Sequence, residues 1–158
     1  MLGEKFRKEY ERIKADSTDM QSGLLAMLHE IQKENGYISQ EDAQELSALT
    51  DISYSRIKAV MTFYTMYNLK KTGKYHIQIC RNLSCHMAGA PELRKALEKK
   101  LSIREGEITH DGLFSFNEVE CLGSCGTAPV IMVNETYHEN MDENKLEKLI
   151  GNLRSNEK

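Results

Sequence analysis

The spacing of apolar residues changes near residue 73, and this change constrains the fold more than any other feature of the chain. Residues 24–31 (LLAMLHEI) place apolar side chains at intervals of three and four, as an amphipathic helix does. Residues 74–80 (KYHIQIC) instead alternate apolar and polar side chains, as a strand does. The sequence therefore predicts a helical N-terminal bundle domain (1–72) followed by an α/β domain (73–158).

Capping residues mark the predicted helices of the first part. Phe6, Tyr10 and Ile13 mark a short first amphipathic helix. Gly36 follows the second apolar stripe, in residues 24–31, and is a good helix stop. Ser39, with Asp42 three residues later, has the form of an N-cap that begins a third helix. Ser53 can cap a fourth. Four helices are therefore expected before the boundary.

The second part alternates strand and helix patterns. Strands are predicted at 74–80 and 114–120, with a helix in the segment 91–101 between them. Residues 129–140 form a predicted hairpin that turns at Asn134-Glu135, and Asp142 can cap a last helix. This order predicts a small sheet with a helix crossover between its first two strands.

Four cysteines stand where the first two predicted strands end. Cys80 and Cys85 form a C-x4-C pair, and 35 residues separate it from a C-x3-C pair, Cys121 and Cys125. Adjacent strand ends would bring all four thiols to one edge of the sheet, where two loops can close around a metal centre. Gly123 and Gly126 let the second loop turn tightly and leave backbone N–H groups free to bond sulfur.

The spacing alone leaves two kinds of metal centre open. Structural zinc prefers C-x2-C pairs, although spacings up to four occur, so the spacing favours iron–sulfur only modestly. A disulfide pair is a third alternative, disfavoured because no secretory feature is present. The sequence contains no C-x-x-C motif, so a thioredoxin-type thiol catalyst is not expected. His86 is not expected to be a ligand, because four cysteines already fill the site.

Composition excludes several classes of partner. The 158-residue chain has 21 Lys and Arg against 24 Asp and Glu, a formal charge of −3, which gives no basic footprint for nucleic acid. No segment approaches the roughly 18 apolar residues of a membrane span, and none resembles a signal peptide. A cytoplasmic protein without direct membrane insertion is expected. The sequence contains no Gly-rich phosphate loop and no Ser-His-Asp order. Nothing therefore suggests that this chain binds NADH or flavin itself.

Two segments around the cysteines carry a family resemblance. Residues 80–101 (CRNLSCHMAGAPELRKALEKKL) and 112–134 (GLFSFNEVECLGSCGTAPVIMVN) resemble the thioredoxin-like 2Fe-2S ferredoxin subunit that accompanies the NADH-oxidising flavoprotein of respiratory complex I. The order C-x4-C, C-L-G-x-C, A-P and a hydrophobic strand is specific to that family. Residues 28–39 (LHEIQKENGYIS) and 60–67 (VMTFYTMY) are similar to its helical segments, so the resemblance covers nearly the whole chain.

The resemblance implies a fold and a cofactor. The C-terminal part would be a thioredoxin-like α/β domain with a small mixed sheet. Cys80, Cys85, Cys121 and Cys125 match the four ligands of one 2Fe-2S cluster, the first pair on one iron and the second pair on the other. No second cysteine set is present, so one cluster is expected.

The resemblance also implies a function and partners. The chain would be a non-catalytic electron-transfer subunit of an NADH:quinone oxidoreductase, located in the cytoplasm or at the cytoplasmic side of the membrane through the complex. Its partners would be a flavoprotein subunit, which carries FMN and binds NADH, and further iron–sulfur subunits. The alternative is the equivalent subunit of an NAD(P)-linked hydrogenase, including electron-bifurcating ones, or of a formate dehydrogenase.

Overall fold

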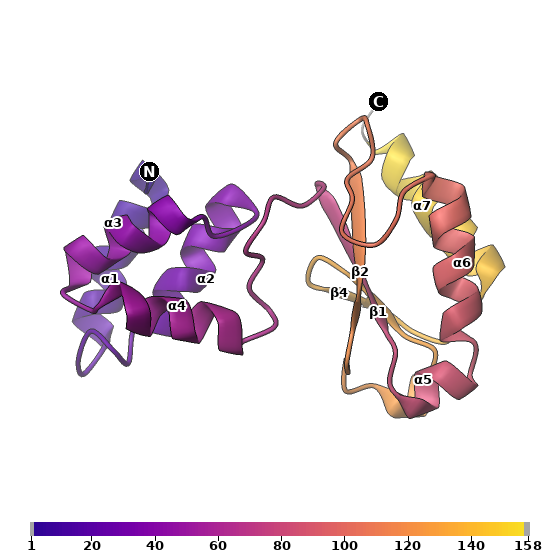
Figure 1. Ribbon diagram of the computed structural model, residues 1–158, viewed down its shortest axis with the longest axis horizontal. Helices are drawn as coiled ribbons and strands as arrows, with labels where there is room; N and C mark the ends of the chain where they lie inside the picture. Colours follow the sequence, from indigo (N-terminus) through magenta and orange to yellow (C-terminus); the bar gives the residue numbers. More distant parts are fainter. Residues whose placement is uncertain (1, 157–158) are drawn as a thin grey trace. The chain divides into compact units, whose positions relative to one another are not determined.

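The computed structural model describes residues 2–156, and the chain divides into two compact units, Met1–Lys71 and Thr72–Lys158 (Figure 1). The described residues of the first unit contain helices only, whereas the second contains the sheet. That residues 1–72 and 73–158 form separate domains stays a prediction. Between residues 2 and 156, no helix is both long and apolar enough to cross a membrane.

The described residues of the N-terminal unit form four helices. They are α1 (Glu4–Asp16), α2 (Leu24–Asn35), α3 (Gln40–Thr50) and α4 (Tyr54–Phe63). Their apolar stripes meet in one core, whose fully buried side chains include Phe6, Met27, Leu28, Ile31, Leu46 and Ile57. The four helices expected from the apolar spacing are therefore present, because each presents a stripe that only its neighbours can cover.

The ends of α2 and α3 follow the predicted caps. Gly36 takes a left-handed conformation (φ 80°), and its N–H donates to the Gln32 carbonyl. At the start of α3, the Ser39 hydroxyl accepts from the Asp42 N–H at 3.0 Å, and the Asp42 carboxylate accepts from the Ser39 N–H at 3.1 Å. This reciprocal capping box satisfies two backbone donors that the helix itself leaves unpaired.

Removing the α3 cap should destabilise the N-terminal unit. We expect Ser39→Ala to lower the free energy of unfolding by about 1 kcal/mol, since the Asp42 N–H loses its acceptor. Urea denaturation followed by circular dichroism measures the change. Ser55→Ala, which deletes the same hydroxyl from an exposed position within α4, is the control. Equal midpoints for the two variants would show that the capping box contributes nothing.

The C-terminal unit contains one mixed sheet. Its elements are β1 (Tyr75–Cys80), α5 (Leu83–Met87), α6 (Ala90–Leu101), β2 (Phe114–Val119), the short 3-10 helix η1 (Cys125–Thr127), β3 (Ile131–Val133), β4 (Thr136–His138) and α7 (Glu143–Ser155). The strand order is β2-β1-β3-β4. β1 pairs parallel with β2, while β3 pairs antiparallel with both β1 and β4. The predicted small mixed α/β sheet is confirmed.

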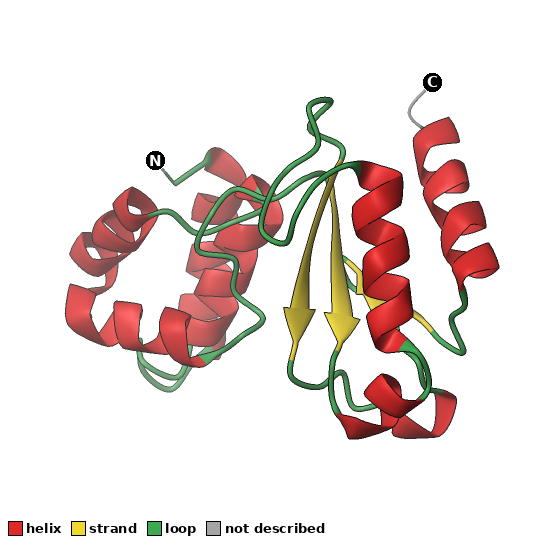
Figure 2. Ribbon diagram, turned by 45° about the vertical axis from the view of Figure 1, so that its right-hand side comes forward, coloured by secondary structure: helices red, strands yellow, loops and turns green. Residues whose placement is uncertain are grey.

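Helices α6 and α7 cover one face of this sheet (Figure 2). The apolar side chains of β1 and β2 on that face pack against the apolar stripes of the two helices. This core includes Ile77, Ile79, Phe114, Phe116, Leu93, Leu97, Leu146 and Ile150. Helix α6, which lies between β1 and β2 in the chain, thus provides both the crossover that a parallel pair requires and a cover for the sheet.

The β3–β4 hairpin turns where the sequence predicts. Val133 pairs with Thr136, which leaves Asn134 and Glu135 as a two-residue loop. Asn134 has a φ of 53°, a left-handed conformation that asparagine tolerates better than most residues. The chain then enters α7 through Asp142, whose carboxylate accepts from the Lys145 N–H at 2.7 Å.

Candidate functional site

The two cysteine pairs leave the sheet at the same end of neighbouring strands. Cys80 is the last residue of β1 and lies beside Val119, the last residue of β2. The Arg81 N–H donates to the Val119 carbonyl at 3.0 Å, so the strands stay paired up to the point where both loops begin. Cys121 follows two residues after β2. The predicted meeting of the two loops at one edge is therefore present in the backbone.

Cys85 lies on the short helix α5, which was not predicted from the sequence. The Asn82 side chain caps this helix by accepting from the Leu83 N–H at 2.8 Å. One face of α5 buries Cys85, which is 2% exposed, while Leu83 and Met87 point outward. The helix thus turns the second thiol of the pair inward, towards the end of β1.

Cys80 and Cys85 are both buried, and the pKa of the Cys85 thiol responds to its neighbours. Burial raises the pKa of the Cys85 thiol, the Val130 N–H lowers it as a hydrogen-bond donor, and Cys80 raises it. A bound metal reverses this balance, because coordination favours the thiolate.

The Cys121 thiol belongs to the loop between β2 and η1. The Gly123 N–H donates to the Cys121 sulfur at 3.3 Å. Gly123 has a φ of 73°, which glycine adopts without the steric cost that a side chain would bring. Cys125 opens η1 at the other end of the turn, and both cysteines are exposed. Gly123 therefore performs both predicted roles, the tight turn and the N–H group presented to sulfur, whereas Gly126 does not take the left-handed conformation.

The donor set fits an iron–sulfur cluster in its chemistry. All four cysteines are free thiols, supplied as two pairs by two loops, and thiolate is the ligand that such clusters use. Within residues 2–156, no three His, Cys, Asp or Glu side chains are grouped closely enough to hold one metal ion. When bound, a cluster of this kind stores one electron.

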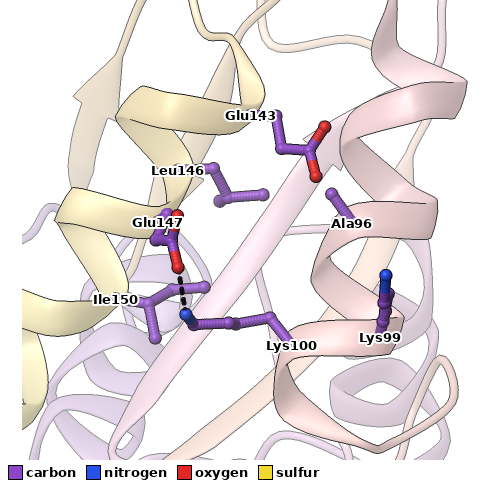
Figure 3. Close-up of a pocket in the computed structure, with 7 residues that line it drawn as sticks. All are labelled: Ala96, Lys99, Lys100, Glu143, Leu146, Glu147 and Ile150. Carbon is purple, nitrogen blue, oxygen red and sulfur yellow. Dashed lines mark hydrogen bonds and ion pairs between the residues drawn. The ribbon is translucent and has the colours of Figure 1, made fainter.

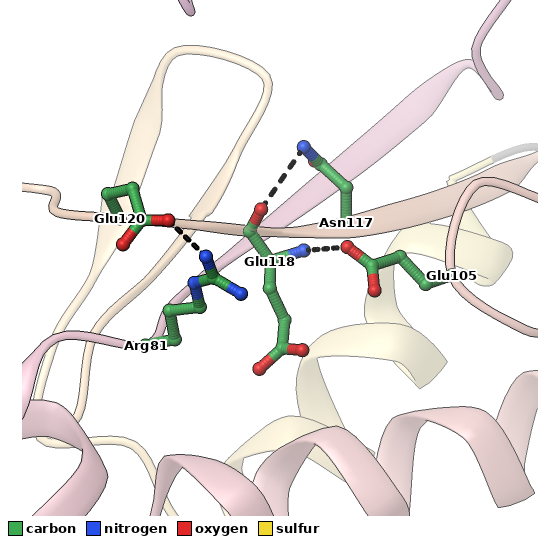
Figure 4. A network of polar contacts seen from close by, with 5 residues as sticks. All are labelled: Arg81, Glu105, Asn117, Glu118 and Glu120. Atoms are coloured by element: carbon green, nitrogen blue, oxygen red, sulfur yellow. Dashed lines mark hydrogen bonds and ion pairs between the residues drawn. The ribbon is translucent and has the colours of Figure 1, made fainter.

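An ion pair joins the two cysteine loops. Arg81 follows Cys80, Glu120 precedes Cys121, and the guanidinium donates to the Glu120 carboxylate (Figure 4). This bond lowers the pKa of the Glu120 carboxyl. The pair was not predicted from the sequence, although opposite charges next to cysteines at paired strand ends were a usable signal.

The same network continues along β2. The Glu105 carboxylate accepts from the Glu118 N–H at 2.9 Å, and the Arg94 guanidinium lies 3.3 Å from the Glu118 carboxylate. The loop that precedes β2 is thus tied to the strand that delivers Cys121. These contacts hold the end of β2 from its outer side.

A hollow of ≈ 340 Å³ lies elsewhere, between α6 and α7 (Figure 3). The Lys100 ammonium and the Glu147 carboxylate form an ion pair across it. It is lined by Ala96, Lys99, Lys100, Glu143, Leu146, Glu147 and Ile150. None of the four cysteines lines this hollow, so it does not belong to the candidate metal centre.

Known proteins resemble this chain over most of its length. The family described as thioredoxin-like [2Fe-2S] ferredoxin matches residues 10–154. NADH-quinone oxidoreductase subunit 2 of Thermus thermophilus is 44% identical over 135 residues, which are 85% of this chain and 75% of that protein. The E subunit of the same kind of enzyme from Rickettsia felis is 41% identical over 130 residues (82% and 78%), and an E subunit from Rhizobium meliloti is 36% identical over 152 residues (96% and 90%).

A solved structure shares the fold. A chain of the NAD+-reducing [NiFe]-hydrogenase in its air-oxidized state matches with a TM-score of 0.72 and 24% identity. The match covers 85% of this chain but only 23% of the hydrogenase chain. At this identity the likeness establishes architecture alone. The family match and the curated relatives go further, and they show that this chain belongs to the thioredoxin-like [2Fe-2S] ferredoxin family.

Proposed function

We propose that this chain is an electron-transfer subunit that carries one 2Fe-2S cluster in an NADH:quinone oxidoreductase. Cys80 and Cys85 would bind one iron, and Cys121 and Cys125 the other. The observation that carries the proposal is the delivery of two cysteine pairs from the paired ends of β1 and β2. Family membership and relatives that are NADH-quinone oxidoreductase subunits support the choice of cluster and of complex.

The protein's own contribution would be to hold the cluster and to set its reduction potential. Burial of Cys80 and Cys85 restricts water on one side of the site, while the exposed Cys121 and Cys125 leave the other side open to a partner. The backbone N–H group of Gly123 donates to the Cys121 sulfur. Ligand charge, such hydrogen bonds and solvent access set the potential of an iron–sulfur centre.

The partner would supply the chemistry that this chain lacks. NADH oxidation and FMN would reside on a flavoprotein subunit, and this chain would exchange single electrons with that flavin without making or breaking bonds itself. Further iron–sulfur subunits would complete the path to quinone. We place the protein in the cytoplasm, or at the cytoplasmic side of the membrane through the complex.

Metal analysis tests the cluster directly. Protein purified anaerobically should contain about two irons and two acid-labile sulfides per chain, because one four-cysteine 2Fe-2S centre binds that number. Its visible absorption should bleach on reduction. Stoichiometric zinc without sulfide would instead identify a zinc-stabilised interaction module. A metal-free chain with a reversible disulfide would identify a thiol oxidoreductase.

Affinity purification tests the host complex. The tagged chain, isolated gently from its native cells, should bring along a flavoprotein and membrane-bound quinone-reducing subunits, identified by mass spectrometry. A hydrogenase or a formate dehydrogenase subunit in their place would contradict the proposed complex while leaving the cluster assignment intact.

A further inference from the structure

A carboxylate outside the cysteine motifs holds the turn that carries Cys125. Glu139 follows β4, and its Oε1 accepts from the Ser124 hydroxyl at 2.5 Å and from the Thr127 hydroxyl at 2.8 Å. These two hydroxyls lie 2.7 Å apart and belong to residues on either side of Cys125. One exposed carboxylate therefore binds both flanks of a single cysteine.

The backbone of the same segment pairs independently with this turn. The Asn140 N–H donates to the Thr127 carbonyl at 2.7 Å, and the Met141 N–H donates to the Pro129 carbonyl at 2.9 Å. These bonds do not involve the Glu139 side chain. Replacing that side chain should therefore leave the chain path in place while releasing the two hydroxyls.

The Glu139 carboxylate brings negative charge to the cysteine turn. Its hydrogen bonds from Ser124 and Thr127 lower the pKa of the carboxyl, so it is ionised at neutral pH. These two partners are neutral, unlike the guanidinium that pairs with Glu120. The Lys145 ammonium contacts the same segment, but it donates to the Asn140 carbonyl, at 2.7 Å.

The Glu139 carboxylate changes the reduction potential of a cluster at Cys125 in two ways, and both changes are in the same direction. A nearby negative charge disfavours the reduced cluster, since reduction adds an electron. Hydroxyls that donate to a carboxylate are also not donating to sulfur, and donation to sulfur would favour the reduced form. Both effects lower the reduction potential.

We propose that Glu139 is a positioning residue for the iron–sulfur site: through Ser124 and Thr127 it fixes the Cys125 turn, and it holds the reduction potential of the cluster down. The inference rests on the proposed function, because it requires Cys125 to be a cluster ligand. It adds a residue that lies outside the cysteine motifs and acts through the hydroxyls that flank Cys125.

The test uses the complete chain, purified anaerobically with its cluster. The midpoint potential is measured by a redox titration followed by electron paramagnetic resonance, and cluster loss by the decay of visible absorption in a chelator. For Glu139→Gln we expect a reduced-to-oxidised ratio about tenfold higher at the wild-type midpoint, a shift of ~59 mV for one electron. We also expect several-fold faster cluster loss.

Two further variants separate charge from anchoring. Ser124→Ala/Thr127→Val removes the hydroxyls but keeps the carboxylate, so it should lose the cluster faster without a rise in potential. Glu143→Gln removes one negative charge from the exposed first turn of α7 and should change neither quantity. A merely structural role for Glu139 would change cluster retention but not the potential.

Each result decides the inference. A potential and a loss rate in Glu139→Gln equal to those of Glu143→Gln would overturn it. Should Glu139→Gln retain no cluster, the double variant decides: rapid loss supports the anchoring, and loss at the wild-type rate overturns it. Wild-type protein without iron and sulfide would instead refute the proposed function, so the two failures are distinguishable.

Discussion

Replacing Cys85 with serine is expected to abolish the cluster. Its thiol is buried beside Cys80, and iron–sulfur centres depend on thiolate ligands that a serine oxygen replaces poorly. Iron and sulfide should fall from about two of each per chain to well below one, and the visible absorption should disappear. Cys125→Ser should have the same effect, because it removes a ligand of the other pair.

The neighbouring histidine provides the matched control. His86 is exposed on the same helix, so His86→Ala alters α5 without removing a proposed ligand. It should keep the wild-type iron and sulfide content. Normal cluster content in Cys85→Ser or Cys125→Ser would show that the ligands are misassigned. Loss of stability together with loss of the cluster is expected, since metal binding and folding are coupled.

Truncating Phe116 should cost the C-terminal unit a large part of its stability. The ring is fully buried on β2, in the core between the sheet and its two helices. Phe116→Ala should lower the free energy of unfolding by about 3–5 kcal/mol, the usual cost of a cavity this size. Domains of this kind are stable by only about 5–15 kcal/mol, so much of the unit should be unfolded in mild urea.

An exposed phenylalanine separates burial from residue type. Phe63, at the end of α4, is 76% exposed, so Phe63→Ala deletes the same atoms without leaving a cavity. We expect a change within about 0.5 kcal/mol. Urea midpoints are compared at equal cluster loading, because a bound cluster itself stabilises the unit. Similar midpoints for the two variants would contradict the assignment of Phe116 to the core.

Most of the fold was predictable because it rests on local patterns. The capping box of Ser39 and Asp42, the helix stop at Gly36 and the turn at Asn134 are each decided by a few neighbouring residues, and each was confirmed. The strands β1 and β2 were recognisable because apolar and polar residue types alternate in the sequence. Burial itself does not alternate, since the last four residues of β1 and the first three of β2 are all buried. The short helix α5 was missed, since five residues carry too little periodicity to identify a helix.

The candidate metal centre was also predictable only in part. The sequence by itself determined the donor chemistry: four cysteines in two pairs, each placed where a strand ends, in an order that identifies the family. Short-range spacing could determine this much, because each pair is set within a few residues of a recognisable strand.

Only the tertiary structure decided what surrounds those cysteines. The tertiary structure determines which thiols are buried and pairs Arg81 with Glu120 across the two loops. It also places Glu139 against the hydroxyls beside Cys125. These partners are 12 to 39 residues apart in the chain. No periodic pattern encodes contacts over that distance, because they depend on how strands pair and loops pack once the sheet has formed.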